Sequence, residues 1–218
     1  MTDPTHLALS GLDRLTDLKD RLLSWASPER SYLADTLRVA ALKSGDRLLD
    51  VGCGSGELLA AAATREPGAV LFGVDPDEDA LELASRKIFG TLRPVELHQA
   101  VAEALPFDSD VFDIVTATLL LQAMPVSLRH EVLTECRRVL RPGGRLLVAD
   151  WIGEPEGLHA LIAYPGDLVR RYMFPHKRPM NVLESLKVTG FFPPELRGTF
   201  STVLGTIELH EAFKPLQA

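Results

Sequence analysis

The chain has 218 residues, and 23 Lys and Arg against 30 Asp and Glu give a formal net charge of −7. With 46% hydrophobic and 24% charged residues, the composition is typical of a single globular domain and too apolar for a disordered chain. The acidic balance argues against a protein that binds DNA or RNA mainly through electrostatics, so we expect no nucleic-acid partner.

The chain start lacks the basic and then apolar pattern of a secretory signal. The longest apolar stretch, Ile114–Met124, is too short to span a bilayer. Cys53 and Cys136 are too few for a disulfide framework, and no CxxC or Cys/His cluster indicates a metal site. We therefore expect a reduced, cytoplasmic protein without a membrane span or a metal. No feature indicates its oligomeric state.

Residues 1–43 are predicted to form a helical cap, because leucines recur at helical spacing and Ser27-Pro28-Glu29 is typical of a helix start. In residues 44–150 short apolar runs then alternate with helical patterns. The expected strands are 47–51, 70–74, 95–99, 112–118 and 145–150, and the expected helices are 57–65, 77–89 and 128–140. Apolar strands separated by helices indicate a parallel sheet covered on both faces, which is a doubly wound α/β fold.

Residues 151–180 break this alternation with four prolines among aromatic and basic residues, so we expect a lid that contacts the substrate. A closing helix at 181–189 and two strands near 196–203 and 206–213 complete residues 181–218. The two strands pair antiparallel, because their joint is too short for a parallel crossover. The whole chain is therefore predicted as one Rossmann-like domain, whose seven-stranded sheet is mostly parallel with an antiparallel last strand.

A glycine loop, Asp50–Gly56, follows the first strand and has the pattern GxGxG. A dinucleotide fingerprint would place Gly or Ala at position 57, where Glu57 would instead repel a pyrophosphate. A phosphate-binding loop ending in Gly-Lys-Ser/Thr is also absent. The preceding Asp50 suits a ligand that carries a cationic amino-acid group.

A second carboxylate, Asp75, ends the second strand. In this topology it lies beside the glycine loop and can accept hydrogen bonds from both hydroxyls of a ribose. The alternative is that Asp75 is the N-cap of the helix that follows. The two roles can coexist, and the strand–loop context favours the ribose.

Together these motifs resemble the class I S-adenosylmethionine-dependent methyltransferases, in particular the small branch of ubiquinone and menaquinone C-methyltransferases (methyltransferase type 11). The resemblance covers about residues 30–215. The segments that carry it are Leu48–Gly56, Gly73–Asp75, Ala102–Phe107, Phe112–Val115 and Arg138–Leu146. It implies a methyltransferase that uses S-adenosylmethionine, releases S-adenosylhomocysteine and acts on a small-molecule acceptor.

The resemblance also implies roles for matched positions. The backbone of Gly52–Gly54 would approach the methionine part of the cofactor, and Asp75 the ribose. Ala102 would offer its backbone to the adenine edge with Val101 beside the ring, and Thr118 would line the floor near the methionine. The full set of implied cofactor-binding residues is Asp50, Gly52, Cys53, Gly54, Gly56, Asp75, Pro76, Val101, Ala102 and Thr118.

The chain departs from the family at two places. Ala100-Val101-Ala102 stands where relatives commonly carry Gly-Asp-Ala, so the Asp that would accept from the adenine amino group is absent. Gln122-Ala123 stands where relatives often have a His pair. These departures motivate the alternative of a non-catalytic protein that binds S-adenosylmethionine or S-adenosylhomocysteine. A nicotinamide dehydrogenase is disfavoured by Glu57, and a nucleic-acid methyltransferase would need the basic residues of the lid.

Methyl transfer from a sulfonium requires mainly positioning and exclusion of water, so no catalytic base is predicted. Polar and aromatic residues after the fourth strand and in the lid are candidates for acceptor contact, although each is also explained by packing or surface exposure. They are Gln122, Asp150, Trp151, His159, Tyr164, Arg170, Arg171, Tyr172 and His176.

Overall fold

One seven-stranded sheet organises the computed structural model, which describes residues 31–91, 94–153, 182–202 and 205–216. The strands are β1 (Arg47–Val51), β2 (Val70–Asp75), β3 (Glu96–Gln99), β4 (Phe112–Thr118), β5 (Leu140–Gly153), β6 (Glu195–Thr202) and β7 (Gly205–Phe213). Their order across the sheet is β3-β2-β1-β4-β5-β7-β6.

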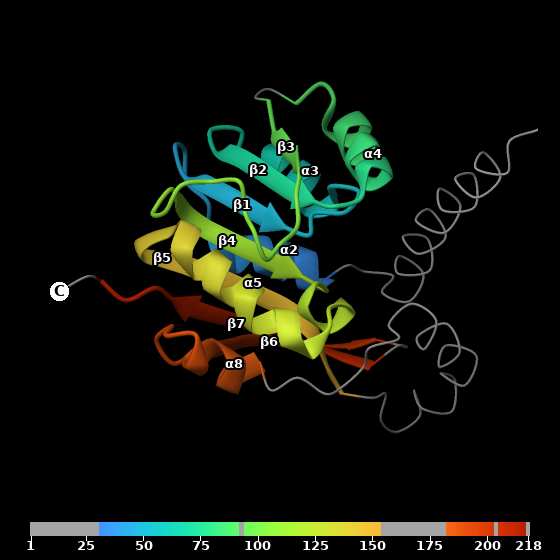
Figure 1. Cartoon of the computed structure of the whole chain (residues 1–218). Helices are drawn as coiled ribbons and strands as arrows, with labels where there is room; N and C mark the ends of the chain where they lie inside the picture. The colour runs from blue at the N-terminus through green and yellow to red at the C-terminus, as the bar shows by residue number, and fades with distance from the viewer. Residues whose placement is uncertain (1–30, 92–93, 154–181, 203–204, 217–218) are drawn as a thin grey trace, which may run out of the picture.

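The direction of the strands confirms the predicted doubly wound fold. β1 to β5 pair in parallel, whereas β7 pairs antiparallel with both β5 and β6. Figure 1 shows β7 pointing opposite to β1 and β4. The strand order reverses at β1, between β2 and β4, and ligands of such sheets bind beyond the carboxyl ends of the strands at this reversal.

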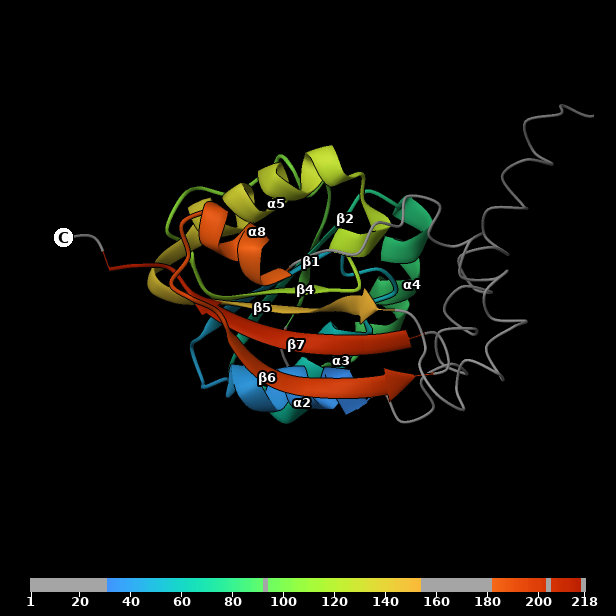
Figure 2. The ribbon, with the colours of Figure 1, turned by 90° about the horizontal axis from the view of Figure 1, so that it is seen from below.

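Helices cover both faces of the sheet, as predicted. They are α2 (Ser31–Ala40), α3 (Glu57–Arg65), α4 (Glu78–Ile88), α5 (Val126–Val139) and α8 (Val182–Val188), with a short 3₁₀ turn η1 (Leu121–Ala123). Figure 2 shows α5 and α8 on one side of the sheet and α2 and α3 on the other. None of these described helices is long and apolar enough to cross a membrane.

Each face has its own apolar core, because side chains alternate along the strands. Leu48 of β1 packs with Leu37 of α2 and Leu59 of α3. The next residue, Leu49, packs on the opposite face with Leu133 of α5 and Leu186 of α8. The strands that carry these residues are buried on both faces, which is why they are predicted well from apolar runs alone.

β5 is longer than the predicted strand at both ends. The prediction placed a turn at residues 141–144, but the amide of Gly143 donates to the carbonyl of Lys214 (2.9 Å), and the amide of Lys214 donates to the carbonyl of Gly144 (2.9 Å). At the other end, Trp151 pairs with Ile207 of β7. The predicted lid boundary at 151 was therefore wrong, since 151–153 belong to the strand. The remaining lid residues, 154–180, and the first 30 residues of the predicted cap lie outside the described residues.

Candidate active site

The glycine loop joins β1 to α3 at the carboxyl edge of the sheet. The amides of Gly52 and Cys53 both donate to the carbonyl of Val74 in β2 (2.8 and 3.0 Å), which ties the loop to the neighbouring strand. Gly52, Gly54 and Gly56 have φ angles of 70°, 51° and 75°. Side-chain-bearing residues rarely adopt this left-handed region, so the loop conformation requires its glycines.

The three glycines differ in their surroundings. A Cβ on Gly52 would lie 2.8 Å from Cδ1 of Leu120, and one on Gly56 would lie 2.8 Å from Cβ of Ala84 in α4. A Cβ on Gly54 would meet nothing within 4 Å. Gly52 and Gly56 thus allow close packing inside the protein, whereas Gly54 presents open backbone that a ligand can approach.

Asp50 is the last but one residue of β1, where the loop begins, and is 1% exposed. Its Oδ1 accepts a hydrogen bond from the hydroxyl of Thr116 in β4 (2.7 Å). Burial raises the pKa of Asp50 to about 7; the Thr116 hydrogen bond opposes this shift, and the nearby charge of Asp75 adds to it. A buried carboxylate with one hydrogen-bonding partner is suited to stabilise a cation that arrives at the loop.

Asp75 is half-buried on the other side of the loop. Its Oδ2 accepts from the amide of Gly54 (2.9 Å), and its Oδ1 accepts from the amide of Asp77 (3.0 Å). The N-cap of α4 is Asp77, which accepts from the amides of Asp79 and Ala80. The alternative in which Asp75 itself caps this helix is therefore wrong, and its carboxylate faces the glycine loop.

The negative charge of Glu57 is partly neutralised by an ion pair that the sequence did not predict. Its Oε1 accepts from Nζ of Lys87 in α4 (2.5 Å), and the same ammonium donates to Oγ of Ser55 (3.1 Å). The repulsion of a pyrophosphate by Glu57, expected from the sequence, is weakened by this ion pair.

Cys53 packs inside the loop. A Cβ on Gly73 would lie 2.9 Å from its Sγ, which shows how closely the thiol contacts β2. Burial, together with the charges of Asp50 and Asp75, raises the pKa of the Cys53 thiol far above its usual range. The thiol stays neutral, which favours a packing role for Cys53 over that of a nucleophile.

The segment after β3 brings Val101 and Ala102 beside Asp75. The amide of Ala100 donates to the carbonyl of Asp75 (3.2 Å), and the amide of Ala104 donates to the carbonyl of Val101 (3.2 Å). Val101 is 43% exposed, whereas Ala102 is buried. Pro76 is exposed at the end of β2. Its carbonyl accepts from Nε2 of Gln99 (3.2 Å).

Thr118 ends β4, and the turn that follows it returns to the glycine loop. Leu119 has φ 54°, an uncommon conformation for a branched residue, and its amide donates to the carbonyl of Ala149 (2.8 Å). Leu120 then contacts Gly52. Strained backbone of this kind clusters at ligand sites, and here it joins the carboxyl ends of β4 and β1.

Asp150 anchors the same turn from β5. Its carboxylate accepts from the amides of Gln122 (3.0 Å) and Trp151 (2.8 Å). Burial raises its pKa to about 6, opposed by these hydrogen bonds and by the charge of Arg129. Oε1 of Gln122 is buried and has no hydrogen-bond partner among the described residues.

Of the acceptor-contact candidates, the structure describes Gln122, Asp150 and Trp151. Trp151 packs into the apolar core on the α2 and α3 side of the sheet, which favours its packing interpretation. The other six, His159, Tyr164, Arg170, Arg171, Tyr172 and His176, lie outside the described residues.

Comparison with known proteins agrees with this geometry. Residues 49–148 match the family model described as a methyltransferase domain. The chain is 35% identical over 179 residues to 27-O-demethylrifamycin SV methyltransferase of Amycolatopsis mediterranei, covering 73% of this chain and 65% of that protein. It is 34% identical over 146 residues to demethylmenaquinone methyltransferase of Thermus thermophilus, covering 67% of this chain and 65% of that protein. Residues 49–148 are thus similar to methyltransferase domains, and these similarities support assignment to the class I S-adenosylmethionine-dependent methyltransferases.

The fold is also similar to that of a solved structure. The crystal structure of a putative methyltransferase from Bacillus halodurans superposes with a TM-score of 0.67 at 26% identity, over 85% of this chain and 99% of that one. The chain spans slightly less than two thirds of the length of its two curated relatives. The similarity to a methyltransferase domain covers residues 49–148, which include the glycine loop and Asp75.

Two residues that shape the site were not predicted from the sequence. Thr116 is the hydrogen-bond donor to buried Asp50, and Leu120 packs on Gly52. A polar residue within the apolar run of β4 was a signal for Thr116. No pattern in the sequence marks Leu120, because its contact depends on the backbone reversal at Leu119.

Proposed function

We propose that this chain is a methyltransferase that uses S-adenosylmethionine to methylate a small-molecule acceptor. The observation that carries the proposal is the pair of carboxylates, Asp50 and Asp75, which flank a GxGxG loop where the strand order reverses. A ligand with an ammonium at one end and a ribose diol farther along matches this pair.

The residues present fit the cofactor. Asp50 would attract the ammonium, the open backbone at Gly54 would approach the methionine part, and the carboxylate of Asp75 would accept from the ribose hydroxyls. Ala102 would offer its backbone to the adenine edge, with Val101 beside the ring, and Thr118 would form the floor. Cys53, Gly56 and Pro76 would shape the loop and its border.

When bound, S-adenosylmethionine supplies a methyl group already activated on a sulfonium. The protein then has to orient the acceptor in line with that methyl group and keep water away. The turn at residues 119–122 would serve this task. Leu120 contacts the glycine loop, and the buried Oε1 of Gln122 has no hydrogen-bond partner among the described residues. A hydrogen bond donated by the methyl-accepting substrate to Oε1 of Gln122 would orient that substrate. No general base is needed for this role.

A small-molecule acceptor is supported by the two relatives, which are named as methyltransferases of 27-O-demethylrifamycin SV and of demethylmenaquinone. Cys53 and Cys136 are both buried free thiols, which is consistent with our proposal of a reduced, cytoplasmic protein.

The proposal is tested by incubating the full chain with S-adenosylmethionine and a panel of phenols and hydroquinones, including demethylmenaquinol. Release of S-adenosylhomocysteine and a mass gain of one methyl group in one acceptor are expected. Tight cofactor binding with no product across the panel would instead favour a non-catalytic binding protein. The matched control is Asp75→Ala, which should release much less product than the wild type at a low micromolar concentration of S-adenosylmethionine.

The pH dependence of cofactor affinity tests the role of Asp50. Its pKa of about 7 in the free protein means that the carboxyl group is largely protonated in mild acid and must lose its proton to pair with the ammonium. We expect the dissociation constant of S-adenosylhomocysteine to fall about tenfold between about pH 6 and about pH 8.

The control is Asp50→Asn, which keeps an acceptor for the Thr116 hydroxyl but cannot ionise. Its affinity should be lower and nearly independent of pH over the same range, when both are measured by calorimetry. If the wild-type affinity does not change with pH over this range, Asp50 does not recognise the ammonium.

A further inference from the structure

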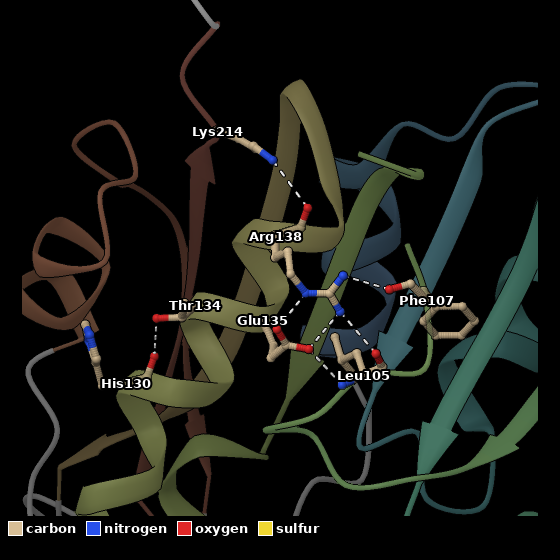
Figure 3. A network of polar contacts seen from close by, with 7 residues as sticks. All are labelled: Leu105, Phe107, His130, Thr134, Glu135, Arg138 and Lys214. Carbon is tan, nitrogen blue, oxygen red and sulfur yellow. Dashed lines mark hydrogen bonds and ion pairs between the residues drawn. The ribbon is translucent and has the colours of Figure 1, made fainter. Parts of the chain in front are cut away.

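Two side chains of α5 hold the segment that follows β3, as Figure 3 shows. Nη1 of Arg138 donates to the carbonyl of Phe107 (2.7 Å), and its Nη2 donates to the carbonyl of Leu105 (3.1 Å). Oε2 of Glu135 accepts from the amide of Leu105 (2.8 Å). Both backbone polar groups of Leu105 are thus satisfied by one helix.

The two side chains also hold each other. Nε and Nη2 of Arg138 donate to the two carboxylate oxygens of Glu135 (2.6 and 2.8 Å), a bidentate pair with fixed geometry. The Glu135 side chain is 18% exposed and the Arg138 side chain 33%. The hydrogen bond from Arg138 lowers the pKa of Glu135, so the pair stays ionised. We call this pair, Glu135 and Arg138, the α5 clasp.

The held segment is anchored beyond the clasp as well. The ring of Phe107 packs edge-on against Phe112 and Phe72, with centroid distances of 4.9 and 5.8 Å. At the other end, Ala100 is bonded to the carbonyl of Asp75 (3.2 Å). Residues 101 and 102 therefore lie on a short span between Asp75 and the clasp, and little freedom remains for their backbone.

The residue at position 101 makes the placement of this backbone important. Val101 and Ala102 have no polar side-chain atom, so at these two positions recognition of the adenine edge would come from backbone groups; the nearest polar side chain on the span is that of Glu103. Backbone recognition depends on where the chain is held, because hydrogen bonds weaken steeply when their geometry is displaced.

We propose that Glu135 and Arg138 are positioning residues that hold the backbone at Ala102 for discrimination of adenine from other bases. The inference rests on the proposed function, since it assumes that the adenine of the cofactor lies at this span. The clasp does not touch the cofactor. It acts through the backbone of Leu105 and Phe107.

The test compares two ligands by calorimetry: S-adenosylhomocysteine and S-inosylhomocysteine, in which hypoxanthine replaces adenine. The exchange turns the amino donor at the base edge into a carbonyl and turns the neighbouring ring acceptor into a donor. The wild-type chain is expected to prefer the adenine ligand at least ~10-fold, the equivalent of one well-placed hydrogen bond.

Arg138→Ala is expected to reduce this preference to about twofold, whereas Arg138→Lys, which keeps the ion pair with Glu135 but cannot bridge both carbonyls, should lie between. Glu135→Gln is a second variant that should also lose preference for the adenine ligand, and it leaves Arg138 in place. The ratio of the two affinities is the decisive readout, because partial unfolding changes the fraction of active protein and not the ratio.

The matched control is Arg137→Ala on the same helix, since Nε of Arg137 donates to the carbonyl of Gly190 on the α8 side (3.2 Å) and not to the held segment. Its preference should equal that of the wild type. If the clasp variants keep the full preference while binding S-adenosylhomocysteine, the inference is wrong and the proposed function stands. If the wild type binds neither ligand, both are wrong.

Discussion

Replacing Asp75 with alanine is expected to weaken binding of S-adenosylhomocysteine about 100-fold, equivalent to about 2.7 kcal/mol for the loss of hydrogen bonds to a charged group. The carboxylate already accepts from the amides of Gly54 and Asp77, so its orientation toward the loop is fixed before a ligand arrives. Calorimetric titration of the purified variant measures the effect.

Asp77→Ala is the matched control for Asp75→Ala, because it removes a carboxylate two residues away that caps α4. It should lower the free energy of unfolding by about 1 kcal/mol while leaving the affinity close to that of the wild type. Equal weakening by the two variants would mean that general negative charge, rather than a ribose contact at Asp75, attracts the ligand.

Gly56→Ala is expected to lower the free energy of unfolding by about 2–4 kcal/mol, because it adds left-handed strain to overpacking. The new Cβ would lie 2.8 Å from Cβ of Ala84 and 3.1 Å from its Cα, so α3 and α4 would have to move apart. Urea-induced unfolding followed by circular dichroism measures this loss.

Gly54→Ala separates the effect on protein packing from the effect on cofactor binding. Its Cβ would meet nothing within 4 Å, so only the backbone strain remains and the expected loss of stability is about 1 kcal/mol. The methyl group would instead occupy the open backbone that we assign to the cofactor, and affinity should fall. A Gly56→Ala protein as stable as the Gly54→Ala protein would contradict the packing roles assigned here.

The sheet could be predicted from the sequence wherever local patterns determine it. β1, β4 and the helix α3 have the predicted bounds, because buried parallel strands and an alanine-rich helix produce strong apolar signals. The full length of β5 could not be predicted in this way. Its ends depend on pairing with Ile207 and Lys214, which lie more than fifty residues farther along the chain.

The candidate site could likewise be predicted only where local motifs determine it. The glycine loop and Asp75 follow from motif and spacing, and the structure brings them together with a hydrogen bond. The partners that tune them are distant in sequence: Thr116 lies 66 residues from Asp50, and Lys87 lies 30 from Glu57. Arg138 belongs to a recognised motif, but its hold on the carbonyls of Leu105 and Phe107 follows only from the fold.

Titration of the wild-type chain with S-adenosylhomocysteine, with NADH in a parallel experiment, tests the central claim most directly. We predict saturable binding of one S-adenosylhomocysteine per chain with a dissociation constant in the micromolar range, about −8 kcal/mol, and no binding of NADH. Folded protein that gives no heat and no thermal shift with millimolar S-adenosylhomocysteine, or that binds NADH in its place, would contradict the assignment of the loop and the two carboxylates.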